Sequence, residues 1–383
     1  MKPELIELYE IRRFLPLPYE AAAEPRLKRV QERLAASRPF WSRLPGEGTA
    51  LLRLHTLAEG IRARGQTLLA VVDGGLRAGV EGVAGCLTGG LGRVRLLSGL
   101  PSEEELNQAL ELAACENVLL YTAGGEHTPA FRLLRAALAD RYGPEAGRYV
   151  LAPGELSPGE EGGFGLLTAA GLLPMAAAGV DVGELLRGAA AMLDRCGVSS
   201  FENPAWRYAA VRRQLQRSGF SVELLCCWEP ALVPLLEWVK RLFASAEGKE
   251  GKALLPVVVD YSREFGAMGQ YIQDGPRMFF ETVVSPGGEG RLSRVREAAV
   301  EGTLLAHTES GVPNLILRPG GREAEALGGL ICFFQFACAL SAAMLDADPF
   351  ARPGTEACEA RIRAVLSSSS WERREPAALA GIL

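Results

Sequence analysis

The stretch Thr67-Leu-Leu-Ala-Val-Val72, followed by Asp73-Gly74-Gly75, decides the class of fold. An apolar run of strand length ends in a turn with two glycines, and a helical pattern follows to about Leu87. The same succession recurs at Asn117–Tyr121, which runs through Thr122-Ala-Gly-Gly-Glu-His-Thr-Pro129 into another helical stretch. Strands that alternate with helices in this way predict a parallel sheet with helices on both of its faces.

The alternation continues along the chain, so we expect an α/β fold of two doubly wound α/β/α sandwich domains with parallel sheets and C-terminal helices. Further strands are predicted at residues 93–98, 149–151, 221–226, 254–260, 279–284 and 314–317. Helices at Leu327–Leu345 and Gly354–Leu366 close the fold. The predicted organisation is a helical N-terminal segment at 1–66, a first domain at 67–196, a second domain with the C-terminal helices at 197–366, and a loose tail at 367–383.

Composition and charge narrow the class of protein. Of the 383 residues, 48% are hydrophobic and 23% are charged, which is typical of a globular chain. The net charge of -5, without a block of like charges, argues against nucleic acid as a partner. Met1–Arg13 lacks the pattern of a signal peptide and the apolar run Leu330–Leu345 is too short to span a bilayer, so we expect a cytoplasmic protein with no membrane partner. Eight cysteines without a CxxC spacing, and only three histidines, predict neither a metal site nor a cofactor.

A series of motifs is similar to those of one enzyme family. It starts at Glu202-Asn-Pro-Ala-Trp-Arg-Tyr-Ala-Ala210 and continues through Trp228-Glu-Pro230 to Gly269-Gln-Tyr-Ile-Gln-Asp-Gly275 and Glu301-Gly-Thr-Leu-Leu-Ala-His307. In order and in spacing, these motifs resemble the bacterial glucose-6-phosphate isomerase family over roughly residues 117–366. The resemblance implies two sugar isomerase (SIS) domains paired into a homodimer. It also implies the family reaction, which converts glucose 6-phosphate to fructose 6-phosphate in glycolysis and gluconeogenesis.

The family's catalytic positions hold residues that cannot perform its chemistry. Isomerisation of a sugar phosphate requires a base of moderate pKa, positive charge near the oxyanion, an acid or base for ring opening, and a phosphate cradle. Ser245 stands where the family's Glu-Ser-Glu-Gly-Lys motif has the glutamate that transfers the proton, and Gly266 stands where it has the ring-opening histidine. The family's active-site lysine corresponds to Glu359, and the arginine of its Gly-Gly-Arg-Tyr-Ser signature to Gly163. By this comparison none of the catalytic groups is intact.

The phosphate loop differs as well. The family's Ser-Lys-Ser-Gly-Thr-Thr-Thr-Glu-Pro holds the dianion with hydroxyls and with amides at a helix N-terminus. This chain has Thr122 at the lysine position, and Glu126 adds a negative charge. Two like charges near 4 Å repel by about 1 kcal/mol in water and by roughly 4 kcal/mol at an effective dielectric of 20. The residues predicted to remain near a bound ligand are Gly74, Gly75, Thr122, Gly124, Gly125, Thr128, Glu247 and Gln270.

Three functions remain open. The leading hypothesis is an isomerase relative that does not catalyse the reaction and is kept for assembly or for binding a sugar phosphate or another small ligand. The alternative is an active glucose-6-phosphate isomerase that uses displaced groups, namely Glu247, His127 or Glu359. The third is an enzyme that acts on an unphosphorylated or cationic ligand, because Glu126 and Glu359 would favour positive charge.

Overall fold

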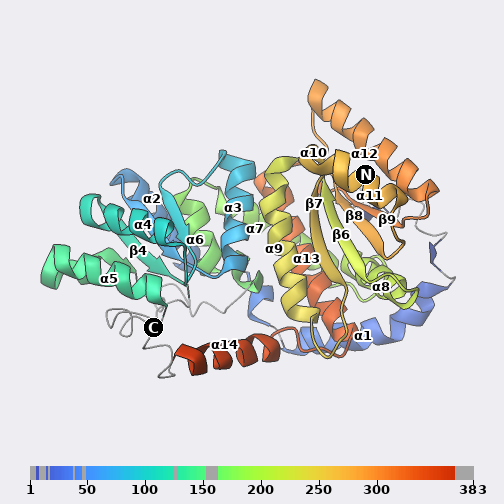
Figure 1. The fold of residues 1–383 in the computed structure, drawn as a ribbon, viewed down its shortest axis with the longest axis horizontal. Coiled ribbons are helices and arrows are strands. Elements are labelled where there is room, and N and C mark those ends of the chain that lie inside the picture. The colour runs from blue at the N-terminus through green and yellow to red at the C-terminus, as the bar shows by residue number, and fades with distance from the viewer. Residues whose placement is uncertain are drawn as a thin grey trace.

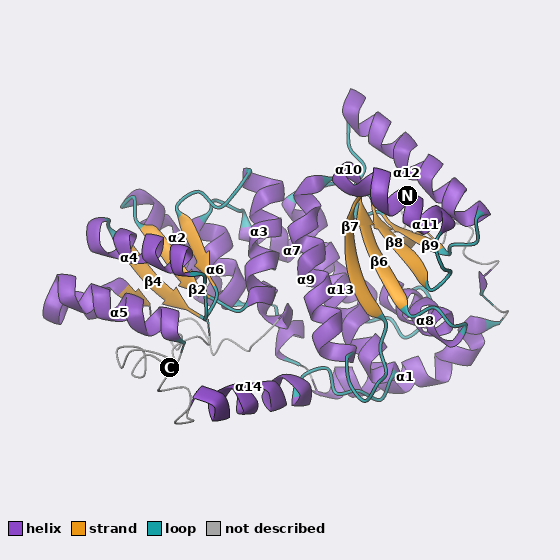
Figure 2. Ribbon diagram, viewed as in Figure 1, coloured by secondary structure: helices purple, strands orange, loops and turns teal. Residues whose placement is uncertain are grey.

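The computed structural model describes residues 6–7, 14–15, 18–37, 39–44, 49–123, 128–151 and 163–366. Two sheets lie apart from each other, each flanked by helices (Figure 1). Four long helices lie between the sheets, as Figure 2 shows by colour: α3 (Gly74–Thr88), α7 (Val182–Cys196), α9 (Val233–Glu247) and α13 (Ala324–Met344). The predicted fold class of two α/β domains with parallel sheets is confirmed.

The first sheet has four parallel strands in the order β3-β2-β4-β5. They are β2 (Thr67–Val71), β3 (Val94–Leu97), β4 (Val118–Thr122) and β5 (Val150–Leu151). Every residue of β2 and β4 is buried, because helices cover both faces of the sheet, and this is why both strands are continuous apolar runs in the sequence. All four strands lie within one residue of their predicted bounds.

Helix α4 (Glu103–Cys115), in the first half, begins at a capping box. The side chain of Ser102 accepts a hydrogen bond from the Glu105 backbone N–H (3.2 Å), and Glu105 accepts one from the Ser102 N–H (3.1 Å), which forms a capping box. The α-helices, besides α3, are α1 (Tyr19–Ser37), α2 (Thr49–Ala63), α4 (Glu103–Cys115), α5 (Pro129–Tyr142) and α6 (Ala169–Ala177). Short 3-10 helices span Phe40–Ser42, Gly143–Tyr149 and Gly163–Leu167.

The second sheet has the order β1-β9-β8-β6-β7. Its strands are β6 (Val222–Cys227), β7 (Leu255–Asp260), β8 (Phe279–Val284), β9 (Asn314–Leu317) and β1 (Ile6–Glu7). The four longer strands are parallel, as predicted, whereas β1 pairs antiparallel with β9. The segment expected to be helical therefore also supplies an edge strand, which covers the backbone of β9 that would otherwise be unpaired.

The helices of the second half include one irregular stretch. The α-helices are α8 (Pro204–Arg217), α10 (Tyr261–Glu264), α11 (Gln270–Asp274), α12 (Arg291–Glu309) and α14 (Pro353–Leu366), and a 3-10 turn spans Pro230–Leu232. A π-helical turn, Phe265–Gly269, joins α10 to α11. Helical structure therefore extends from Tyr261 to Asp274.

Helix α13 is longer than predicted. Its 21 residues are long and apolar enough to cross a membrane, so the argument that its apolar run is too short does not hold. However, 94% of its most apolar window is buried inside the protein, which is typical of a core helix. It packs so closely on α7 that a Cβ atom at Gly188 would clash with the carbonyl oxygen of Glu325, and one at Gly328 with that of Leu185. Glycine at both positions allows this approach.

The two sheets repeat one topology. Numbered in chain order within each half, the four parallel strands have the order 2-1-3-4 in both sheets. Chain connections leave the two central strands in opposite directions, so each sheet has a switch point at the carboxyl ends of those strands. These are β2 and β4 in the first sheet, and β6 and β8 in the second. Ligands of such folds bind at this place, which gives two candidate sites.

Candidate functional site

A cavity of about 430 Å³ opens at the switch point of the first sheet. The turns after β2 and β4 form one side of it, while α9 and α14 contribute the other, so both halves of the chain supply its walls. Predicted site residues and residues without a predicted role lie together there. The lining residues are Val71, Val72, Asp73, Gly75, Gly99, Ala123, Thr128, Gly163, Arg241, Ser245, Arg352, Thr355 and Glu359.

The side chain of Asp73 caps the N-terminus of α3. Its Oδ1 accepts hydrogen bonds from the backbone N–H groups of Gly75 (2.7 Å) and Leu76 (3.0 Å). Free amides at the N-terminus of a helix would offer a phosphate site, but here the carboxylate already occupies two of them. From the sequence, this segment was predicted to be a glycine turn, and Asp73 had no predicted role. An aspartate directly before a helical stretch was the available signal.

Ser245 lies on α9 and faces the cavity as an ordinary hydroxyl. Its Oγ donates to the backbone carbonyl of Leu242 (3.1 Å), a contact within the same helix. Among the described lining residues there is no histidine or lysine that could activate it. An unactivated serine is a poor base at neutral pH, so Ser245 supplies no proton acceptor to this cavity.

Gly163 lines the cavity but is packed tightly against α9. A Cβ atom there would lie 3.1 Å from Leu242 Cδ1 and 3.3 Å from Trp238 Nε1. The Trp238 indole N–H donates to the Gly163 carbonyl oxygen (2.8 Å), which fixes this backbone to the helix. The neighbours would have to shift to admit an arginine side chain at this position.

The charged groups that line the cavity balance each other. Arg241 and Arg352 oppose the carboxylates of Asp73 and Glu359. Arg241 Nη1 also lies 3.0 Å from Glu237 Oε2, so part of its charge is neutralised within α9. Neither arginine was predicted, because each belongs to an element distant in sequence from the β2 and β4 turns. The cavity therefore favours neither a strongly anionic nor a strongly cationic ligand.

Other predicted residues lie elsewhere. Gly266 is exposed in the π-helical turn and does not line this cavity. Gln270 is also exposed and donates to Asp274 Oδ2 within α11 (2.7 Å). Thr122 is fully buried and donates to the Val71 carbonyl oxygen (3.1 Å). Gly75 and Thr128 do line the cavity, and Gly74 lies next to Arg241. The predicted positions Gly124, Gly125, Glu126 and His127 lie outside the described residues.

Glu247 belongs to a buried ion network under the second sheet. Arg212 donates to Glu247 Oε1 (2.5 Å) and to Glu223 Oε2 (2.7 Å), and all three side chains are 1% exposed. The Tyr208 hydroxyl donates to the other oxygen of Glu223 (2.5 Å). Burial alone would lower the pKa of Arg212, but the two carboxylates outweigh it and raise that pKa. Glu247 is thus engaged in the core, away from the cavity.

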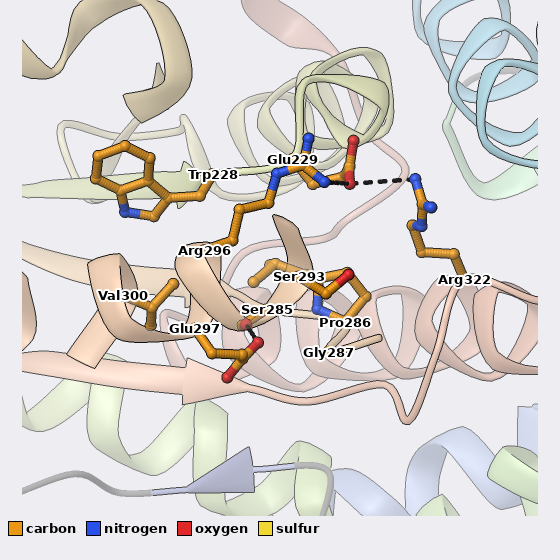
Figure 3. A pocket seen from close by; sticks show the side chains of 11 residues that line it. Trp228, Glu229, Ser285, Pro286, Gly287, Ser293, Arg296, Glu297, Val300 and Arg322 are labelled. Atoms are coloured by element: carbon orange, nitrogen blue, oxygen red, sulfur yellow. Dashed lines mark hydrogen bonds and ion pairs between the residues drawn. The ribbon is translucent and has the colours of Figure 1, made fainter. Parts of the chain in front are cut away.

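The switch point of the second sheet is closed by side chains (Figure 3). Its pocket measures about 20 Å³, against about 430 Å³ for the first cavity. Arg296 Nη1 lies 2.7 Å and Arg322 Nη1 3.1 Å from Glu229 Oε2, so both guanidiniums hold one carboxylate. Ser285 donates to Glu297 Oε1 across the pocket (2.6 Å). The charged groups of this pocket pair with one another, and its volume is small, so it offers less to a ligand than the first cavity does. Its buried Trp228 Nε1 has no acceptor within the described part of the chain.

Comparisons with known proteins agree with the motifs. No family model matches the chain. The glucose-6-phosphate isomerase of Symbiobacterium thermophilum is 38% identical in an alignment 286 residues long, and the match covers 64% of this chain and 64% of that protein. The enzyme of the same name from Bacillus thuringiensis is 37% identical in an alignment of the same length, and the match covers 63% of each chain. The match therefore spans just under two thirds of these relatives.

Solved structures agree on the fold. A hypothetical protein from Thermus thermophilus superposes with a TM-score of 0.82 at 19% identity, over 95% of this chain and 99% of that one. A glucose-6-phosphate isomerase from Chlamydia trachomatis superposes with a TM-score of 0.70 at 13% identity, over 84% of this chain and 74% of that one. Together with the sequence matches, these results confirm the predicted resemblance to the glucose-6-phosphate isomerase family.

Proposed function

We propose that this chain, which resembles bacterial glucose-6-phosphate isomerases over 64% of its length, is a non-catalytic relative that binds a small polyhydroxylated ligand in the cavity of its first sheet. One observation carries the proposal. Ser245 stands at the family's base position, faces the cavity, and uses its hydroxyl in a contact to its own helix. The scaffold of the reaction is kept while its proton acceptor is missing.

The remaining acids are poorly suited to replace the base. Asp73 lines the cavity, but its Oδ1 is already engaged by two backbone amides of α3 and is not free to take a proton from a substrate. Glu359 is exposed on α14 and stands where the resemblance places a lysine. Each lost acid or base typically costs about 10²–10⁴ in rate. The combined changes at Ser245, Glu359 and Gly163 support a rate far below that of an isomerase.

The same residues support a ligand without a phosphate group. Asp73 occupies amides of α3 that could otherwise hold a phosphate, and its charge would repel a dianion placed there. The balanced charges of the lining residues suit a neutral sugar or polyol, whose hydroxyls can both donate and accept hydrogen bonds. An unphosphorylated ligand is therefore the form of the proposal that the cavity favours.

A coupled assay tests the absence of catalysis. Glucose 6-phosphate or fructose 6-phosphate is supplied at millimolar concentration and product is followed through a dehydrogenase. We expect no turnover above the protein-free rate. Turnover at the rate of an ordinary enzyme, about 1–10³ per second, would refute the proposal.

One observation favours the alternative of an active isomerase with displaced groups. Of the three groups considered for that role, Glu359 lines the cavity, Glu247 is buried with Arg212, and His127 lies outside the described residues. If Glu359 were the base, Glu359→Gln would abolish any turnover found in the wild type. Thr355→Val, one turn earlier on α14 and also in the cavity wall, is the matched control.

The proposal includes a cytoplasmic homodimer. On α14, Ile362 is 57% and Val365 58% exposed in the single chain, and neighbouring exposed apolar side chains are typical of association surfaces. Sedimentation velocity of the wild type and of Ile362→Lys measures the association. A wild type that stays monomeric at 100 μM or so would rule the dimer out.

A further inference from the structure

Three arginines gather around a pocket between α1 and α8, outside the site described above. Arg26 comes from α1, while Arg213 and Arg217 lie one turn apart on α8. The two helices are packed together beside the second sheet, away from the first (Figure 1). The pocket measures about 30 Å³ and shares no lining residue with the first cavity. Its other lining residues are Tyr19, Ala22, Ala23, Ala210, Gln214 and Met344.

The positive charge of this pocket is only partly neutralised. Arg26 Nη2 lies 2.6 Å from Asp346 Oδ1, which is the carboxylate paired with the cluster. Arg213 Nη1 donates to the neutral Gln216 side chain (2.6 Å). Arg217 is exposed, and within the described part of the chain no hydrogen bond or ion pair engages it. Glu20 is also near, but it is exposed and accepts from the Tyr19 hydroxyl (3.1 Å).

Arg213 has an unsatisfied donor. Its Nε atom is buried and donates to no acceptor in the described part of the chain. Burial lowers the pKa of Arg213, and the guanidiniums of Arg217 and Arg26 lower it further. A buried donor without a partner and neighbouring like charges are both costly, and an oxyanion would relieve both at once.

We propose that this pocket, the α1–α8 arginine pocket, binds a phosphate-sized oxyanion between Arg213 and Arg217, with Arg26 at its rim. Guanidinium groups suit such a ligand because their N–H donors form paired hydrogen bonds to phosphate oxygens. The ligand is either free phosphate or the phosphate group of a small metabolite. This proposal is independent of the proposed function, because the two sites share no residue.

Calorimetric titration with inorganic phosphate at constant ionic strength tests the proposal. We expect saturable binding, weakened about tenfold by Arg217→Gln and by Arg213→Gln, as loss of one charge-assisted contact implies. Arg217 is exposed, so its variant keeps the fold even if Arg213→Gln does not. The matched control is Arg135→Gln, which removes the same charge from an exposed position on α5 and leaves the affinity unchanged.

A variant that is expected to strengthen phosphate binding sharpens the test. Asp346→Asn removes the carboxylate that competes for Arg26, so phosphate binding strengthens several-fold. Asn tolerates the positive φ of Asp346 (59°), so the backbone remains unstrained. A parallel titration with fructose 6-phosphate distinguishes free phosphate from the phosphate group of a metabolite as the ligand. A metabolite site binds fructose 6-phosphate more tightly than inorganic phosphate, and it loses that binding in Arg217→Gln. Absence of saturable phosphate binding, or affinity unchanged in both arginine variants, overturns the proposal.

Discussion

The two switch points of this molecule share a topology and differ in what fills them. In the first, Asp73 accepts hydrogen bonds from the amides of α3, and a cavity of about 430 Å³ remains. In the second, Glu229 is held by Arg296 and Arg322, and only about 20 Å³ remains. Strand order places both sites, whereas side chains decide which one stays open. A carboxylate near each switch point also means that neither is arranged for a phosphate dianion.

The halves differ most in their buried charge, and this predicts the largest effect. Arg212→Met leaves the carboxylates of Glu223 and Glu247 buried without the positive charge that balances them, so the free energy of unfolding should fall by about 3–5 kcal/mol. The control, Arg93→Met, breaks an exposed ion pair with Glu116 in the first half and should cost under about 1 kcal/mol. Urea denaturation measures both. Equal losses in the two variants would show that Arg212 does not organise the second half.

Opening the second switch point should have a smaller effect. Glu229→Gln removes the carboxylate shared by Arg296 and Arg322, and because these arginines are 31% and 44% exposed, water screens much of the resulting repulsion. We expect a loss of about 1–2 kcal/mol by urea denaturation. Glu237→Gln, which breaks an exposed pair with Arg241 on α9, is the matched control. A cost of zero for Glu229→Gln would mean that this pocket is not held closed by its ion pairs.

Removing the Asp73 cap at the first switch point should cost still less stability. Asp73→Ala leaves the amides of Gly75 and Leu76 without their acceptor and should cost about 1 kcal/mol. Asp73→Ser keeps a capping oxygen without the charge and should recover most of that loss. Thermal unfolding of the three proteins orders them as wild type, Ser and Ala. An alanine variant as stable as the wild type would contradict the capping role.

The smallest effect concerns pH. The Ser102 backbone N–H, and then Arg77, lower the pKa of Glu105. A carboxyl whose pKa is lower in the folded state stabilises the protein above its unfolded pKa, near 4.3, and loses that contribution as the pH falls through the folded value. Because Glu105 is largely exposed, the contribution is under about 0.5 kcal/mol. Wild type and Glu105→Gln should therefore converge in stability between pH 5 and 3 or so, whereas a constant difference would exclude the linkage.

The fold was predictable because its strands are buried on both faces. The apolar runs around Leu69 and Leu120 mark central strands, and the Ser102 capping signal marks a helix start. The sequence did not indicate that residues 6–7 join the second sheet, since a two-residue edge strand has no periodicity to detect. The position of helix α13 was predicted, but its length was underestimated, because polar Glu325 in its first turn interrupts the apolar pattern.

The candidate site was predictable only in part. The resemblance indicated Ser245, Gly163 and Glu359, and the structure brings all three to one cavity. Arg241 and Arg352 were missed, because long-range packing of α9 and of the segment before α14 against the first sheet brings them there. Glu247 was named as a ligand contact, but sequence does not say which face of α9 it occupies, and the structure places it against Arg212.

The central claim is that Asp73 has taken the place of a phosphate at the first switch point. Calorimetric titration tests this role of Asp73 directly. Fructose and fructose 6-phosphate are titrated in the Arg217→Gln background so that the α1–α8 arginine pocket does not contribute. The account predicts that the phosphate group adds no affinity with Asp73 present and adds it when Asp73→Ala is introduced. Fructose 6-phosphate binding tenfold or more tightly than fructose while Asp73 is intact, a difference of about 1.4 kcal/mol, would contradict it.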